Sequence, residues 1–494
     1  MKKYIFKTLI CSALALSLTT SCELDQYPDG SIPSEKSWEK VSDAQKFYTG
    51  LLNSFRNVTG GSHNYVSEVQ SDLFNETGVL HVDQIHTWLF TTAQFDGDGK
   101  WANNFGLVND ANNILDNIDK VPAQNAQEEE ILKNIKGAAY FARAFAYANM
   151  LPRYCKEYNE ATAASDLGLP LLKTVDVNAR PFRAKLDKTI EFILGDIAAA
   201  DTLIMEGTDI TAPNKNVLTA LKARVLLYKK DYEGAIEAAT SLFADYPLAT
   251  ADAYAAMWTD DVASEIIFQP LMTPSERGGS YSPAFISYNQ GQACWSPSYL
   301  PTQGLIDLYE AGDVRKDAFF KEALLGAKDE TAMGYYFCKF PGNPALYKTG
   351  EDNKTSFYNM CKVFRTSEMY LIAAEASLFK AQPDEATALS LLKTLRENRG
   401  LETDNLTGDA LVQLLKKEWV REMVGEGFRL DCLKRWGDGV KRMTPQALDA
   451  NILVTIDNYT NLNVQPGSDL YYKIIWELPL NDTEANGNLE PNWK

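Results

Sequence analysis

The chain has 494 residues, of which 45% are hydrophobic, which is enough apolar material for a large globular core. It carries 66 acidic and 48 basic residues, a net charge of −18 at pH 7. Because such a surface repels phosphate groups, we exclude nucleic acid as a partner and electrostatic attachment to an anionic membrane.

The first 22 residues have the pattern of a bacterial lipoprotein signal. Three lysines precede an apolar run at residues 9–18 that is too short to span a bilayer, and small residues 19–21 precede Cys22. We predict that residues 1–21 are removed and that Cys22 is lipidated, because two or three acyl chains at about 0.8 kcal/mol per buried CH₂ give a stable anchor. An ordinary secretory signal cut near Ser21 is the alternative.

The next part of the chain is expected to be helical. Apolar residues recur at steps of three and four residues, the spacing of one face of a helix. Helices expected from this spacing cover residues 38–55, 101–118, 131–148, 186–205 and 217–229. An irregular stretch separates the first helix from the second, and a turn at Pro122 separates the second from the third.

A tetratricopeptide-like repeat follows. The residues on its spacing are Ala223, Leu226, Tyr232, Ala235, Ala239, Leu242 and Pro247. A weaker copy covers residues 370–399, in which Pro383 opens the second helix. A further helical pair covers residues 410–435, with Gly425 and Gly427 at its joint. Such units stack because none of them buries its apolar face alone.

Between residues 248 and 362 the helical period fades, and we predict a loop-rich irregular insertion. Residues 273–304 contain four prolines and five aromatic residues but only two charged ones. A long loop with this composition is typical of a binding segment rather than of disorder. The predicted fold is therefore all-α, a tetratricopeptide-like scaffold over residues 38–247 and 363–440 that carries this insertion within one domain, 22–494.

Cysteine and histidine usage gives no sign of a metal or catalytic centre. Five cysteines beyond Cys22 show no C-x-x-C pairing, so we expect scattered buried thiols rather than a zinc site or a disulfide framework. Only three histidines are present, and none stands in a nucleophile motif. We expect no metal, no cofactor and no catalysis.

Several sequence blocks resemble one known family in order along the chain. They are residues 24–28 (LDQYP), 137–147 (GAAYFARAFAY), 168–171 (GLPL), 364–376 (FRTSEMYLIAAEA), 418–422 (EWVRE), 428–436 (FRLDCLKRW), 478–480 (LPL) and 491–493 (PNW). These blocks resemble the SusD/RagB lipoproteins of the Bacteroidetes outer membrane. The resemblance implies a lipid-anchored protein facing the cell exterior that captures oligosaccharide and delivers it unaltered to a SusC-like TonB-dependent transporter.

Three other functions are compatible with parts of this pattern. Uptake of peptides or glycopeptides would use the same scaffold, and a purely structural protein would bind no small ligand. A surface glycosidase would need two carboxylates across a cleft. Glu422 and Glu426 lie four residues apart on one helix, and we interpret them as members of ion pairs instead.

A sugar site needs flat aromatic rings and polar side chains that both donate and accept hydrogen bonds. The candidate ligand residues are Trp88, Asp96, Trp101, Asn104, Tyr288, Gln290, Trp295 and Tyr299. Trp295 lies in the sparsely charged loop, where it either contacts ligand or packs the loop onto the core. Trp101 stands where the resemblance suggests a binding tryptophan, although its helical phase favours core packing equally. Trp88 could instead belong to a buried strand.

Substitution Cys22→Ala tests the anchor. We expect the variant to lose membrane retention while its soluble body and its ligand binding are unchanged, because only the acylated sulfur attaches the chain. Release of the protein from washed membranes is the measurement. Retention equal to that of the wild type would contradict the prediction.

Overall fold

The computed structural model describes residues 37–79, 83–93, 99–262, 264–448, 452–453 and 461–493. The signal segment, Cys22 and Asp96 lie outside the described residues. The described chain is mainly helical, with 47% helix and 10% strand. The expectation of an all-α fold is therefore corrected, because part of the chain pairs into small sheets. None of the described helices combines the length and the hydropathy that a bilayer crossing requires.

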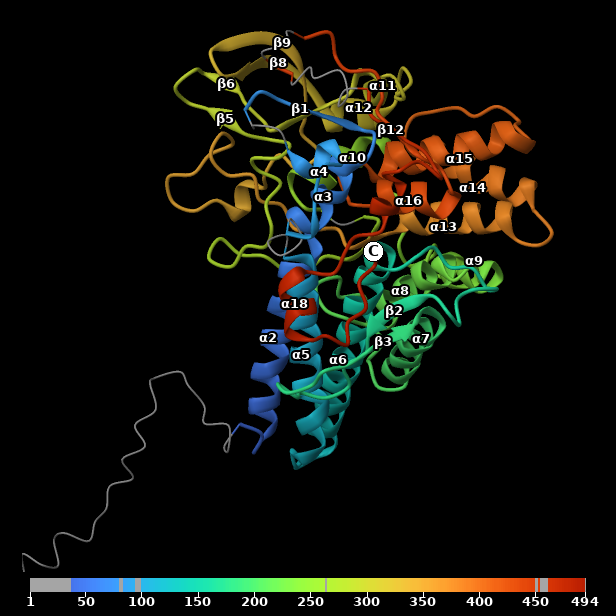
Figure 1. The fold of residues 1–494 in the computed structure, drawn as a ribbon. Helices are drawn as coiled ribbons and strands as arrows, with labels where there is room; N and C mark the ends of the chain where they lie inside the picture. Colours follow the sequence, from blue (N-terminus) through green and yellow to red (C-terminus); the bar gives the residue numbers. More distant parts are fainter. Residues whose placement is uncertain are drawn as a thin grey trace, which may run out of the picture.

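The N-terminal half is built on long helices that pack side by side. Its helices are α2 (Val41–Thr59), α3 (Ser62–Gln70), α4 (Gln84–Thr87), α5 (Lys100–Asn117), η3 (Ile118–Lys120), α6 (Ala126–Tyr154), α7 (Leu186–Asp201), α8 (Lys215–Tyr228) and α9 (Tyr232–Thr240). Figure 1 shows α2, α5 and α6 together at one end of the molecule, with α7 and α8 beside them. Strands β2 (Leu167–Pro170) and β3 (Arg183–Lys185) pair between α6 and α7.

A second helical group lies toward the C-terminus. It contains α13 (Thr366–Phe379), α14 (Glu385–Glu397), α15 (Gly408–Met423) and α16 (Arg429–Trp436). Helix α13 packs against α9, so the two helical groups share one core. Gly425 and Gly427 have φ of 81° and 90°, which confirms their expected place at the joint between α15 and α16. The expected helices are present in the structure, with ends shifted by a few residues.

Strands are concentrated in the segment between the two helical groups. Its elements are α10 (Ala251–Thr259), β4 (Ile266–Phe268), β5 (Tyr288–Asn289), β6 (Cys294–Trp295), β7 (Tyr299–Pro301), α11 (Gln303–Ile306), α12 (Val314–Phe319), β8 (Phe320–Ala327), β9 (Glu330–Phe337) and η4 (Pro344–Leu346). Strands β5, β6, β8 and β9 form one sheet in that order, at the end of the molecule opposite to the lower ends of α2 and α6 (Figure 1).

Short strands attach this segment to the rest of the chain. Strand β7 pairs with β1 (Phe74–Glu76), and β4 pairs with β10 (Phe364–Arg365), both antiparallel. Near the C-terminus, β11 (Val440–Lys441) pairs with β12 (Asn463–Val464), followed by η5 (Tyr471–Ile474) and α18 (Leu480–Ala485). The insertion is therefore tied to both helical groups. The bounds of the insertion, residues 248–362, remain a prediction from the sequence.

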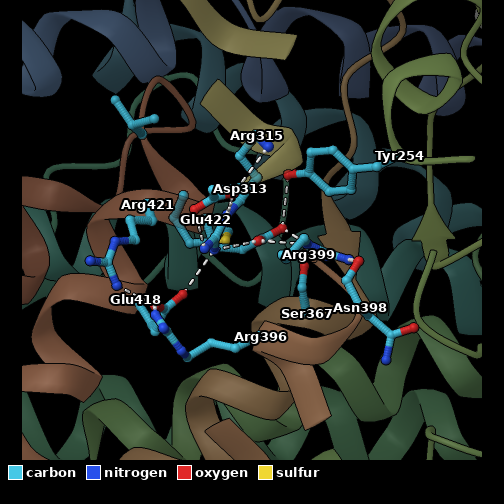
Figure 2. A network of polar contacts seen from close by, with 12 residues as sticks. Tyr254, Asp313, Arg315, Ser367, Arg396, Asn398, Arg399, Glu418, Arg421 and Glu422 are labelled. Carbon is cyan, nitrogen blue, oxygen red and sulfur yellow. Dashed lines mark hydrogen bonds and ion pairs between the residues drawn. The ribbon is translucent and has the colours of Figure 1, made fainter. Parts of the chain in front are cut away.

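A buried ion-pair network joins the helical groups to the insertion (Figure 2). Glu422 of α15 accepts hydrogen bonds from Arg315 of α12 (3.2 Å), Arg365 of β10 (2.8 Å) and Arg399 after α14 (3.0 Å). Tyr254 of α10 donates to the same carboxylate at 3.0 Å. The side chains of Glu422 and its three arginines are fully buried. Each charge is thereby compensated where water cannot reach it.

Glu418, one turn earlier on α15, extends the network. It accepts hydrogen bonds from Arg315 (2.9 Å), Arg396 (2.6 Å) and Arg421 (2.5 Å). Burial alone would raise the pKa of Glu418, but these three arginines outweigh it and lower the pKa to about 2. The interpretation of this region as ion pairs that hold the last helices is confirmed.

The five cysteines of the described chain are buried and unpaired, as the sequence predicts. Burial raises the pKa of the Cys155 and Cys432 thiols to about 11, and that of the Cys338 and Cys361 thiols to about 12. Such thiols are protonated at neutral pH and are therefore poor nucleophiles.

Substitution Glu422→Gln tests the network. We expect it to lower the free energy of unfolding by about 3–5 kcal/mol, because it removes the one carboxylate that three buried arginines share. Equilibrium unfolding in denaturant is the measurement. Lys188→Ala, which breaks the exposed Lys188–Glu191 pair, is the control and should leave stability nearly unchanged. A loss below about 1 kcal/mol for Glu422→Gln would contradict the prediction.

The low pKa of Glu418 predicts a specific acid sensitivity. The unfolded chain takes up this proton near the ordinary value of 4.5, whereas the folded protein takes it up only near 2. Stability from Glu418 is therefore fully present above pH 4.5 and is lost as the pH falls toward 2. The melting temperature of the wild type should fall as the pH is lowered through this window. The melting temperature of Glu418→Gln should fall less steeply. Parallel curves for the two proteins would refute this assignment.

Candidate functional site

The β5–β6 hairpin carries the most exposed aromatic residues of the sparsely charged loop. Tyr288 and Trp295 are directly opposite each other in its register, so their side chains lie on one face. Asn289 shapes the turn, because its side-chain oxygen accepts from the backbone N–H of Gly291 (3.0 Å) and of Gln292 (3.1 Å). Parallel pairing of Trp295 with Leu325 attaches the hairpin to β8.

Three aromatic rings form what we call the Trp295 platform: Tyr288, Trp295 and Tyr336. Trp295 stacks on Tyr336 of β9 with ring centroids 4.6 Å apart and an interplanar angle of 14°. Tyr288 meets Trp295 edge to face at 5.2 Å and 75°. Tyr336 is buried, whereas Trp295 and Tyr288 are half-buried. The platform is therefore backed by buried Tyr336, while Tyr288 and Trp295 keep part of their surface exposed to solvent.

Polar groups surround the platform. Gln290 at the tip of the hairpin is exposed, whereas the amides of Asn289 and Gln292 are bonded to each other at 2.9 Å. Gln292 also donates to the backbone oxygen of Lys328 at 2.6 Å, which ties the β5–β6 turn to the β8–β9 turn. The amides of Asn289 and Gln292 are therefore engaged within the protein, whereas Gln290, the predicted ligand residue, is exposed.

Tyr299 does not belong to this exposed face. It lies on β7, is 5% exposed and donates its hydroxyl proton to Asp83. Burial, and next the Asp83 carboxylate, raise the pKa of Tyr299 well above its ordinary value. Its selection as a ligand platform is corrected, because its ring is packed in the core with Phe74 and Phe285.

Trp88 is also corrected. It is fully buried, and its indole N–H donates to the backbone oxygen of Gln70 at 2.9 Å. It caps α4 in the left-handed region, with φ of 62°, rather than forming a buried strand. No ring face of Trp88 is open to a ligand in this structure.

Trp101 and Asn104 lie on the core face of α5. Trp101 is 4% exposed and packs edge to face on Tyr154 at 4.9 Å, so core packing is the correct alternative. Asn104 is fully buried, donates to the backbone oxygen of Lys100 and accepts from Asn149. For Trp101, the helical phase had made core packing an equal alternative. Their assignment as ligand contacts is corrected.

Comparison with known proteins identifies the family. The SusD family matches residues 322–493, and the family described as starch-binding associating with outer membrane matches residues 24–227. The chain belongs to the SusD/RagB family. SusD-family proteins are binding proteins rather than enzymes. The resemblance read from the sequence blocks is therefore confirmed.

Relatives of this SusD/RagB-family chain match it over most of its length. The SusD-like protein P38 of Formosa agariphila is 23% identical, covering 87% of this chain and 91% of the relative. A SusD superfamily structure from Bacteroides thetaiotaomicron superposes with a TM-score of 0.76 at 22% identity, covering 92% and 100% of the two chains. A laminarin-binding SusD-like protein gives a TM-score of 0.70 at 17% identity, covering 92% and 100%.

Burial argues against acid–base chemistry at the paired glutamates of this SusD/RagB-family protein. Glu422 is fully buried among arginines, and Glu426 accepts from Arg365 (2.7 Å) and Lys339 (2.6 Å). Both carboxylates are thus neutralised by buried cations rather than placed across a cleft as an acid–base pair. Within the ranges that the structure describes, no cluster of three or more His, Cys, Asp or Glu side chains could hold a metal ion.

Two features of the surface were missed by the sequence analysis. Tyr336 supports Trp295 although it lies outside the aromatic loop; the alternation of the β8–β9 hairpin could have indicated it. Tyr472 of η5 is 50% exposed and meets Trp493 edge to face at 5.5 Å. Trp493 of this second pair packs on the helical core, apart from the cluster that holds Trp295.

Proposed function

We propose that this protein is a glycan-binding lipoprotein of the outer membrane and that it holds oligosaccharide on the Trp295 platform without altering it. The observation that carries this proposal is the half-open indole of Trp295, held flat against Tyr336 at 4.6 Å. Sugar rings present apolar C–H faces that pack on such a surface, and pre-ordering of the ring lowers the entropic cost of binding.

The surroundings of the platform supply the polar part of this interaction. Exposed Gln290 can donate to and accept from ring hydroxyls at the hairpin tip, and Tyr288 offers a second ring at right angles. Family membership supports a carbohydrate ligand, since one matching family is described as starch-binding and one similar structure as laminarin-binding. Of the residues selected from the sequence, the proposed site keeps Tyr288, Gln290 and Trp295.

Delivery of the bound glycan to a SusC-like TonB-dependent transporter completes the proposal. Lipidated Cys22 would hold the protein at the outer membrane, facing the cell exterior, beside that transporter. Helix pairs α8–α9 and α13–α14 would form the tetratricopeptide-like part of the frame. The outer-membrane association in the description of the matching family supports this location.

Substitution Trp295→Ala tests the proposed site. We expect glycan affinity to fall by about 1–3 kcal/mol, the range for loss of one stacked aromatic ring at a binding site. The ligand is first identified on a glycan array with the mature protein, and its affinity is then measured by isothermal titration calorimetry.

Tyr472→Ala is the matched control, because it removes another exposed aromatic ring that lies elsewhere on the surface. The glycan affinity of Tyr472→Ala should equal that of the wild type. Melting temperatures of both variants verify that they are folded. Unchanged affinity in folded Trp295→Ala, or an equal loss in Tyr472→Ala, would refute the Trp295 platform as the site.

A further inference from the structure

Lys354 lies at the edge of the Trp295 platform. Its ammonium nitrogen is 4.4 Å from the centroid of the Tyr288 ring and donates to the Tyr288 hydroxyl at 3.3 Å. Tyr288 in turn contacts Trp295 at 5.2 Å. One cation is therefore attached directly to the half-open aromatic surface, at a distance typical of a cation–π contact.

The backbone around Lys354 is held in place by its own hydrogen bonds. Asp352 accepts from the backbone N–H of Lys354 (2.9 Å) and from the hydroxyl of Thr355 (3.0 Å). Arg277 binds the adjacent Glu351 through two hydrogen bonds of 3.1 and 2.6 Å. The loop that carries Lys354 is thus tied through Arg277 to residues 273–304. This tie and the loop's own hydrogen bonds hold the backbone that presents the ammonium group to Tyr288.

The ammonium group of Lys354 has no ion-pair partner in the described part of the chain, where no Asp or Glu oxygen lies within 4.0 Å of its nitrogen. The nearby acid, Asp352, accepts hydrogen bonds from local donors and interacts with the Lys354 charge only at longer range. The hydrogen bond from the Lys354 backbone, and next that from the Thr355 side chain, lower its pKa. Lys354 therefore keeps protons that it can donate to a ligand.

This arrangement is notable in a strongly acidic protein. The chain carries a net charge of −18, which at long range disfavours an anionic ligand. At physiological ionic strength charges are screened beyond about 8 Å, so the groups next to the ligand decide the local preference. One such group at the platform is the Lys354 ammonium, which contacts Tyr288.

We propose that Lys354 makes this site selective for acidic glycans, with the ammonium group binding an anionic substituent of a sugar that stacks on Trp295. The substituent is a carboxylate of a uronic acid or a sulfate ester, since both present anionic oxygens to a lysine. This inference rests on the proposed function of the Trp295 platform and deepens it by naming the substrate class.

Matched pairs of glycans test the inference. The array carries oligogalacturonates beside their neutral methyl esters, and sulfated oligosaccharides beside their desulfated forms. We expect the wild type to bind the acidic member of a pair about tenfold more tightly, as one charge-assisted hydrogen bond allows. The two kinds of pair distinguish a carboxylate from a sulfate. Raising the salt concentration should reduce the preference.

Two variants assign the preference to the charge. Lys354→Met keeps an aliphatic side chain against Tyr288 but removes the ammonium group, and it should bind both members of a pair with nearly equal affinity. Lys354→Arg keeps the charge and should retain the preference. Trp295→Ala should weaken binding of both members. Melting temperatures establish that each variant is folded.

Failure of this inference can be distinguished from failure of the proposed function. If the wild type bound only neutral glycans, the role of Lys354 would be overturned. The same would follow if Lys354→Met kept the full preference for acidic glycans. Either result would leave glycan binding at Trp295 intact. Absence of binding to every glycan on the array would overturn both. If Lys354→Met lost affinity equally for both glycans of a pair, Lys354 would have a purely structural role, and the inference would also be overturned.

Discussion

Buried charges that must be compensated govern how the segments of this protein assemble. Glu422 and Glu418 on α15 hold arginines that come from three other segments of the chain. Each partner alone would be an isolated charge in a medium that solvates it poorly, so the segments must assemble together. Hydrophobic contacts supply most of the free energy of folding, but they are not directional. The network specifies which helix meets which strand.

This constraint reaches the surface through the insertion. Arg315 lies in the first turn of α12, and α12 leads directly into β8, which pairs with the β5–β6 hairpin. Arg365 lies on β10, which pairs with β4 at the start of the same segment. The buried ion pairs thereby anchor both ends of the insertion to the helical groups. A platform built on such anchored elements keeps its geometry before a ligand arrives, which favours binding.

Sequence reasoning found the helices because their apolar residues repeat over many turns, and it placed Gly425 and Gly427 at their joint. It did not find β5 and β6, which have two residues each and show no period, and it overlooked the alternation of the longer β8 and β9. The sequence could not show which tryptophan is exposed to a ligand. Trp88, Trp101 and Trp295 are chemically equivalent in sequence, and only tertiary packing buries the first two and leaves the third half-open. Tyr336, the support of Trp295, lies 41 positions further along the chain.

The five enclosed thiols have a practical consequence for spectroscopy. None of them forms a disulfide, and burial keeps each one protonated, so maleimide reagents should react with them slowly. A single cysteine introduced at an exposed site, with Cys22 removed, would therefore carry a fluorophore selectively without prior deletion of the native cysteines. Pairs of such labels would allow distances within the folded protein to be followed by energy transfer while a saccharide is added.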